Sequence, residues 1–68
     1  MPIQRQGTIA DLNRFDAAKK LHKPVGELKA RIENGEEVII VESSFSDPGG
    51  DYTALHVGDE CVGYWPGY

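Results

Sequence analysis

A junction between a helix pattern and a strand pattern divides this chain near residue 35. Before the junction, apolar residues recur on one face of a helix predicted over residues 24–33. Asn34-Gly35 is typical of a helix end, because glycine readily takes the left-handed backbone conformation found there. After the junction, the run Val38-Ile39-Ile40-Val41 is β-branched throughout, which favours a strand that is apolar on both faces. The sequence therefore predicts helices first and strands second.

The residues before this helix predict one or two further short helices. Residues 1–7 are polar, and we expect them to form a loose arm. Thr8 suits the N-cap of a helix that carries an acidic residue in its first turn, and a second helix could begin at Ala17. Lys23-Pro24 then interrupts the pattern, because the residue before a proline is pushed out of the α region.

Three strands are predicted after the junction, over residues 36–45, 52–57 and 60–65. The segment Asp47–Asp51 is rich in glycine, proline and aspartate and reads as a loop. Gly58-Asp59 suits a two-residue hairpin turn of type II′, which prefers glycine first.

The predicted fold class is α+β, with two or three short N-terminal helices followed by a three-stranded antiparallel β-meander. One domain covers residues 1–68, since a chain this short allows no second core. Its parts are the arm (1–7), a basic helical part (8–34) and an acidic meander (36–65).

The hairpin turn also predicts which side chains share a face of the sheet. Continuous pairing outward from the turn places Thr53 opposite Tyr64 and Tyr52 opposite Trp65. Alternation then puts two sets of residues on opposite faces: Leu55, Val62, Thr53 and Tyr64 on one, and Tyr52, Trp65, Ala54, Cys61 and His56 on the other. We expect one face to cover the helices and the other to bind a partner or a second copy of the chain.

Charge is separated along the chain. All seven basic residues lie within residues 1–32 together with three acidic residues, which gives that segment a net charge of +4. Residues 33–68 hold eight acidic residues and no Lys or Arg, for a net charge of −8. Such asymmetry indicates a charged partner, head-to-tail packing between copies of the chain, or an ordinary solvated surface.

No catalytic or metal site is expected. Cys61 is the only cysteine, and together with His22 and His56 it gives too few ligands, too widely scattered, for a structural zinc site. His56 and Cys61 could meet across the hairpin as a nucleophilic pair, but no third residue is placed to orient the histidine. We therefore expect a non-enzymatic protein without a cofactor.

The sequence also predicts a cytoplasmic location without a membrane contact. It has no apolar run of the roughly 20 residues that a membrane-spanning helix needs. Its first residues lack the apolar stretch of a signal peptide.

Two surfaces are candidates for binding. The first would contact a protein through acids and aromatics, which are favoured interface anchors: Tyr52, Tyr64, Trp65, Glu36, Glu37, Asp47, Asp51, Asp59 and Glu60. Such acids could also occupy a groove that binds nucleic acid, so the protein partner could itself be a nucleic-acid-binding one. The second surface would contact DNA phosphates through basic residues: Lys19, Lys20, Lys23, Lys29 and Arg31.

Residues 17–41 resemble the lambda Cro type of small phage repressor, a helix-turn-helix protein followed by strands. The matching positions are Ala18, Lys19, Leu21, Leu28, Ile32 and Gly35. The resemblance implies a Cro-like fold and DNA binding. The sequence departs from the family at the start of the recognition helix, where Val25 and Gly26 replace polar base-reading residues. It departs again after the glycine, where Glu36 and Glu37 replace basic residues.

Residues 27–40 are similar to the helix–glycine–strand segment of Phd/YefM-type antitoxins. Both families belong to the regulation of mobile elements. The leading hypothesis is a small non-enzymatic regulator or inhibitor, phage- or mobile-element-borne, that binds a protein through the acidic, aromatic surface. The alternatives are a Cro-like DNA-binding repressor and a structural protein of a phage particle, and self-association as a homodimer stays open.

Overall fold

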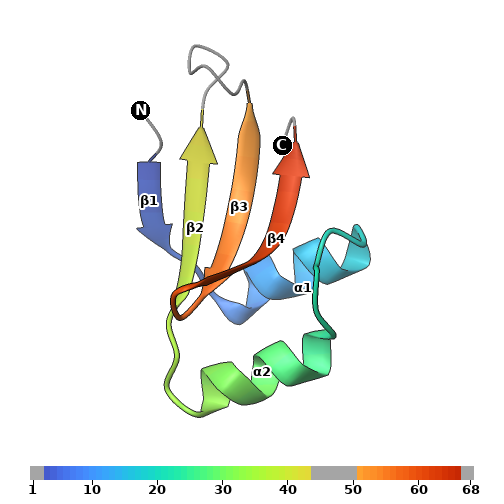
Figure 1. Ribbon diagram of the computed structural model, residues 1–68, viewed down its shortest axis with the longest axis vertical. Helices are drawn as coiled ribbons and strands as arrows, with labels where there is room; N and C mark the ends of the chain where they lie inside the picture. Colours follow the sequence, from blue (N-terminus) through green and yellow to red (C-terminus); the bar gives the residue numbers. More distant parts are fainter. Residues whose placement is uncertain (1–2, 44–50, 67–68) are drawn as a thin grey trace.

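The computed structural model describes residues 3–43 and 51–66. Its elements follow one another as β1 (Ile3–Gln6), α1 (Ile9–Ala17), α2 (Val25–Glu33), β2 (Val38–Ser43), β3 (Tyr52–Val57) and β4 (Glu60–Pro66). The four strands form one antiparallel sheet in the order β1-β2-β3-β4 (Figure 1). The protein is α+β overall, and both helices lie between the first and second strands of the sequence.

The predicted order of N-terminal helices followed by a three-stranded meander is therefore wrong. Residues 3–6, expected within a loose arm, form an edge strand that pairs with β2 from Ile3↔Glu42 to Gln6↔Ile39. All four residues of β1 are exposed. Their sequence, Ile-Gln-Arg-Gln, does not alternate apolar and polar residues and so does not predict a strand. Backbone pairing with β2 and an ion pair between Arg5 and Glu42 hold this strand in place, and the local sequence predicts neither.

Gly7 allows the chain between β1 and α1 to pass close to β2. Its N–H donates a hydrogen bond of 2.7 Å to the carbonyl of Val38. A Cβ atom at this position would lie 2.8 Å from Val38 Cγ1 and 3.0 Å from Ile40 Cγ1, so a larger residue would push the chain away from β2. The predicted N-cap at Thr8 is confirmed, and its N–H donates to Asp11 Oδ2 at 2.9 Å.

Both helices end in the same hydrogen-bonded motif with a left-handed residue. Gly35 has φ +99° after α2, as predicted, and Lys19 has φ +58° after α1. The motif also explains why no second helix begins at Ala17. The N–H groups of Lys19 and Lys20 donate back to Asp16 and Phe15, at 3.0 and 2.8 Å, and so turn the chain out of the helix.

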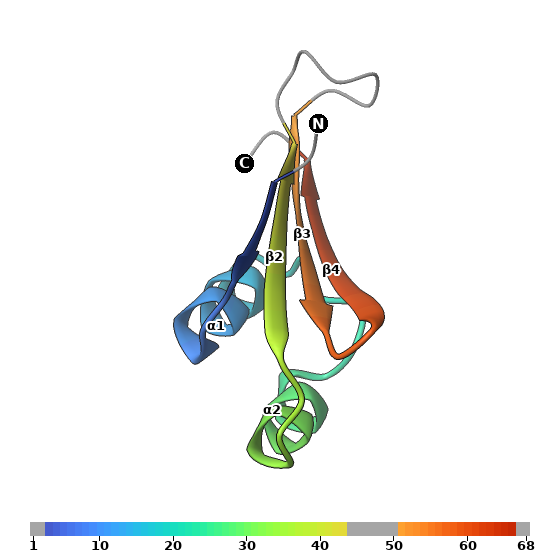
Figure 2. The same ribbon diagram turned by 90° about the vertical axis from the view of Figure 1, so that its left-hand side faces the viewer.

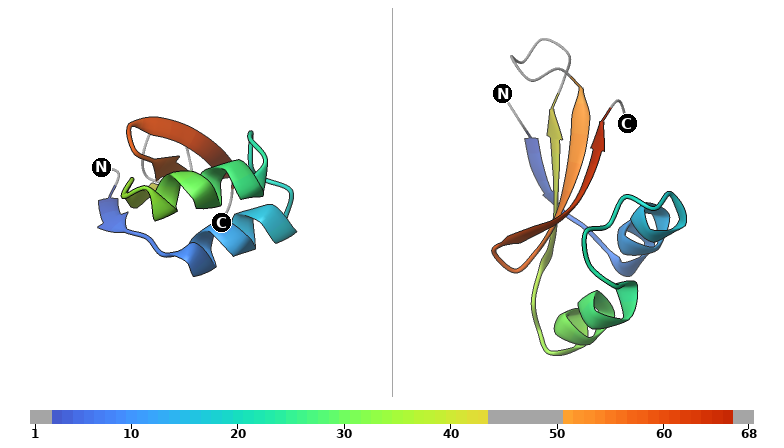
Figure 3. Two further views of the ribbon diagram at one scale, coloured as in Figure 1. Left: turned by 90° about the horizontal axis from the view of Figure 1, so that it is seen from below. Right: turned by 45° about the vertical axis from the view of Figure 1, so that its right-hand side comes forward.

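The two helices lie at the lower end of the sheet in Figures 1 and 2, with α1 beside one face of the strands and α2 below them. Leu12 and Phe15 of α1 and Leu28 of α2 are buried there. They pack on apolar side chains of the three longer strands: Val38, Ile40, Leu55, Val57 and Val62. Figure 3 shows the same separation from two further sides, with the sheet on one side and both helices on the other.

A one-residue bulge in β4 changes the predicted register. The turn itself is confirmed, with φ +62° at Gly58 and the pairs Val57↔Glu60 and His56↔Cys61. Beyond that point Leu55 pairs with Gly63 instead of Val62, so each later residue of β4 moves to the opposite face. The predicted placement of Tyr64 and Trp65 is therefore wrong, because the two exchange faces.

The bulge lies where the connection between the helices contacts β4. The His22 N–H donates to the Val62 carbonyl at 2.7 Å, and the Tyr64 N–H donates to the Lys20 carbonyl at 3.2 Å. A Cβ atom at Gly63 would lie 2.9 Å from Phe15 Cδ2, so only glycine fits this approach without movement. The outer edge of β4 is thus partly covered, whereas β1 has no neighbour on its outer side among the described residues.

Candidate functional site

One face of the sheet turns away from both helices, and no other described helix or strand packs on it. Side chains alternate along each strand, so the residues between the core positions point to this side. We call this surface the open face and define it by nine residues: Gln4, Gln6, Ile39, Val41, Tyr52, Ala54, His56, Cys61 and Tyr64. Neither helix reaches it (Figures 2 and 3).

Apolar and aromatic side chains run across the open face. Ile39 and Val41 of β2 are only half-buried. Tyr52 and Tyr64 lie on neighbouring strands with ring centroids 5.4 Å apart and an interplanar angle of 32°. Tyr64 is 42% exposed, and it reaches this face because of the bulge in β4. The open face therefore presents a partly hydrophobic surface to its surroundings.

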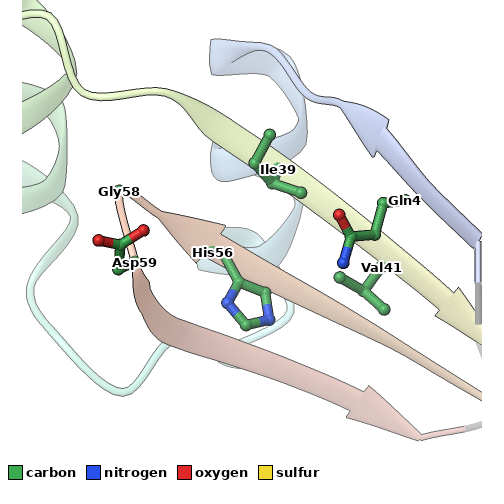
Figure 4. Close-up of a pocket in the computed structure, with 6 residues that line it drawn as sticks. All are labelled: Gln4, Ile39, Val41, His56, Gly58 and Asp59. Carbon is green, nitrogen blue, oxygen red and sulfur yellow. The ribbon is translucent and has the colours of Figure 1, made fainter.

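A shallow hollow lies at the hairpin end of the open face. It measures about 410 Å³ and is lined by Gln4, Ile39, Val41, His56, Gly58 and Asp59 (Figure 4). Ile39 and Val41 supply an apolar floor from β2, while Gln4, His56 and Asp59 supply polar groups from β1, β3 and the turn. The hollow can therefore accept a group that is apolar along its length and polar at one end.

The open face contains no lysine or arginine, and carboxylates lie at both of its ends. Asp59 stands in the turn beside the hollow. Glu37 is exposed and precedes β2 in the alternation that includes Ile39, and its carbonyl accepts the Gly58 N–H at 2.9 Å. Asp51 precedes β3 at the other end. None of the three carboxylates has an ion-pair partner within residues 3–43 and 51–66.

Other acids predicted to bind a partner are already paired within the protein. Arg31 donates from Nε and Nη2 to the two carboxylate oxygens of Glu36, at 2.9 and 2.8 Å. Its Nη1 donates to Glu60 Oε1 at 2.7 Å, and Lys23 Nζ lies 3.2 Å from Glu60 Oε2. Hydrogen bonds from Arg31 lower the pKa of Glu36 and of Glu60, and Lys23 lowers that of Glu60 further.

These ion pairs connect the basic and acidic parts of the sequence. Arg5 adds another, with its Nε 2.9 Å from Glu42 Oε1. Two of the five candidate DNA-binding residues, Lys23 and Arg31, are therefore engaged internally. Lys19, Lys20 and Lys29 are the remaining three, and they lie on the helical side of the molecule.

The other predicted binding residues are divided between the two sides of the sheet. Tyr52 and Tyr64 lie together on the open face, with Asp59 at its hairpin end. Trp65 lies on the helical side, where its ring meets Phe15 edge-on with centroids 5.4 Å apart and an interplanar angle of 85°. Asp47 lies outside the described residues.

Several residues of the open face are not among the predicted binding residues. The sequence predicts a loose arm at Gln4 and a strand that is apolar on both faces at Ile39 and Val41. His56 was considered as a partner of Cys61, and the two do lie opposite each other. The sequence does indicate that the open face lacks basic residues. No Lys or Arg follows residue 32, and three of the four strands come from that segment.

The described residues contain no group of three or more side chains suited to hold a metal ion. Each of the two helices has nine residues, too few for the roughly 20 that cross a bilayer. Comparisons with known protein families, curated proteins and solved structures find no match for this chain.

Proposed function

We propose that this protein is a small non-enzymatic regulator or inhibitor that binds another protein through the open face. The observation that carries this proposal is a set of partly exposed apolar and aromatic side chains, Ile39, Val41, Tyr52 and Tyr64, on a face that neither helix reaches. Small proteins rarely leave a contiguous apolar patch on a sheet unless it contacts something. Tyrosine is also among the residues that contribute most to protein interfaces.

The arrangement of charge supports a protein partner over nucleic acid. The open face has no basic side chain other than His56, so it offers nothing to neutralise phosphates. On the helical side, Lys23 and Arg31 are held by Glu60 and Glu36. The exposed acids Glu27 and Glu33 share helix α2 with Lys29 and further weaken the attraction of DNA.

A matched pair of substitutions tests the proposal. Val41→Arg puts a long charged side chain on the open face, and Ala30→Arg makes the same change of charge on an exposed position of α2. A protein captured from cell lysate should bind the wild type and Ala30→Arg, and should be lost with Val41→Arg. Thermal melts followed by circular dichroism would establish that all three proteins are folded.

Two results would contradict the proposal. One is capture of the same protein by Val41→Arg at the level of the wild type. The other is recovery of nucleic acid alone. A titration with duplex DNA at about 50 mM salt would then measure the affinity, since phosphate contacts are strongest at low salt.

A further inference from the structure

The hollow at the hairpin end of the open face has a chemistry of its own. Its floor is aliphatic, from Ile39 and Val41, and a carboxylate, that of Asp59, stands at its margin (Figure 4). His56 and Gln4 also line the hollow, with an aromatic ring and an amide. An apolar stem that ends in a cation would satisfy both parts of this lining.

Charge around the hollow favours a cation from outside the protein. Asp59 has no ion-pair partner in the described part of the chain, and Glu37 lies on the neighbouring strand end. Arg31, which also donates to the Val57 carbonyl beside the turn at 3.2 Å, is already held by Glu36 and Glu60. Among residues 3–43 and 51–66, no side chain is therefore placed to neutralise the Asp59 carboxylate.

We propose that the hollow binds a lysine or arginine side chain of the partner protein. The stem would lie on Ile39 and Val41, and the cation would meet the Asp59 carboxylate beside His56. Long basic side chains bury their methylene groups on apolar surfaces while the charged end stays at the margin, which matches this layout. The inference rests on the proposed function and adds that the partner surface is basic at this point.

Four short peptides separate the contributions of stem and charge. They are the acetylated, amidated tripeptides Gly-X-Gly with lysine, arginine, norleucine or glutamate at the central position. Each is titrated at low ionic strength into the ¹⁵N-labelled protein, and backbone amide shifts are followed by NMR. We expect the lysine and arginine peptides to shift Ile39, Val41, His56 and Gly58, norleucine to bind more weakly, and glutamate to leave these amides unchanged.

Two variants with the same change of charge provide the control. Asp59→Asn should weaken binding of the lysine and arginine peptides about two- to fivefold, the range expected for an exposed ion pair. Glu27→Gln removes an exposed acid from α2 and should leave that binding unchanged. The inference is overturned if norleucine binds as tightly as lysine, if Asp59→Asn has no effect, or if the basic peptides do not shift the hollow.

Failure of this inference differs from failure of the proposed function. If Val41→Arg abolishes capture of the partner while Asp59→Asn and the peptides have no effect, the open face is an interface without a cation site. If the peptides bind the hollow but Val41→Arg leaves capture unchanged, the proposed function is wrong. If a second copy of this chain fills the hollow, the mass of the protein in solution should increase with its concentration. That result would overturn the proposal that the hollow binds a basic side chain of another protein.

Discussion

Arg31 and Glu36 join the end of helix α2 to the residues that lead into β2, through two hydrogen bonds of 2.9 and 2.8 Å. The N–H of Glu36 also donates to the carbonyl of Arg31 at 3.2 Å. Helix ends of this kind usually bring two apolar side chains together at these positions. Here an ion pair takes their place, and Glu60 of β4 extends it to the far strand.

The paired carboxylates make stability depend on acidity. Because the folded-state pKa values of Glu36 and Glu60 lie below the ordinary 4.5, their contribution is complete above that value and is lost as the pH falls through the lowered values. Urea midpoints for the wild type should exceed those of Glu60→Gln at pH 7, and the difference should shrink below about pH 4.5. Glu33→Gln, an exposed residue of α2, serves as the control. A difference that stays constant down to pH 2 would contradict the assigned pairing.

Two glycines should respond in opposite directions to alanine. At Gly63 the added Cβ would meet Phe15 Cδ2 at 2.9 Å and the Lys20 carbonyl at 3.2 Å, so we expect a loss of about 1–3 kcal/mol. At Gly26, within α2, nothing lies within 4 Å, and alanine should add about 0.5–1 kcal/mol through its helix propensity. Denaturant unfolding measures both, and a neutral Gly63→Ala would contradict the close approach at the bulge.

Lys19 occupies a conformation that suits glycine better. Its φ of +58° is left-handed, which strains a residue with a Cβ atom. Lys19→Gly should therefore raise the free energy of unfolding by about 0.5–1 kcal/mol, after the greater freedom of glycine in the unfolded chain is allowed for. Lys20→Gly, one residue later and without a positive φ, should lower it. Equal effects of the two changes would argue against this helix end.

The bulge in β4 predicts different roles for Tyr64 and Trp65. Trp65 is half-buried against Phe15, so Trp65→Ala should cost about 2–3 kcal/mol of stability. Tyr64 lies on the open face, and Tyr64→Ala should cost about 1 kcal/mol or less while it weakens capture of the partner. Urea unfolding and the capture assay measure the two effects, and the reverse order of stability would support the register without a bulge.

Turn chemistry was the part of the fold that could be predicted from the sequence. Thr8, Gly35 and Gly58 each mark a boundary by a backbone requirement that their own residue type reveals. Gln4 and Gln6 pair with Val41 and Ile39 of β2, and no residue type in β1 reveals this pairing. The sequence therefore does not predict β1. The exchange of Tyr64 and Trp65 was missed because it depends on how Gly63 approaches Phe15, a contact between distant parts of the chain.

The candidate site was predictable only in part for the same reason. The composition of residues 33–68 indicated a surface rich in acids and aromatics, and Tyr52, Tyr64 and Asp59 do lie on or beside the open face. Composition could not reveal that Glu60 is paired with Arg31, because the two residues lie 29 positions apart along the chain. Pairing across that distance is set by the packing of α2 on the sheet.

The position of β1 in the sheet has a consequence for how the protein folds. The meander from β2 to β4 is built from neighbours in the chain, with Val57 and Glu60 only one turn apart. β1 instead meets β2 across the whole helical segment, from Gln6↔Ile39 to Ile3↔Glu42. Closing that loop costs more chain entropy than closing a hairpin. The four residues of β1 are exposed, so they bury little apolar surface to offset that cost. β1 should accordingly dock last, onto a nucleus formed by the other three strands and the helices.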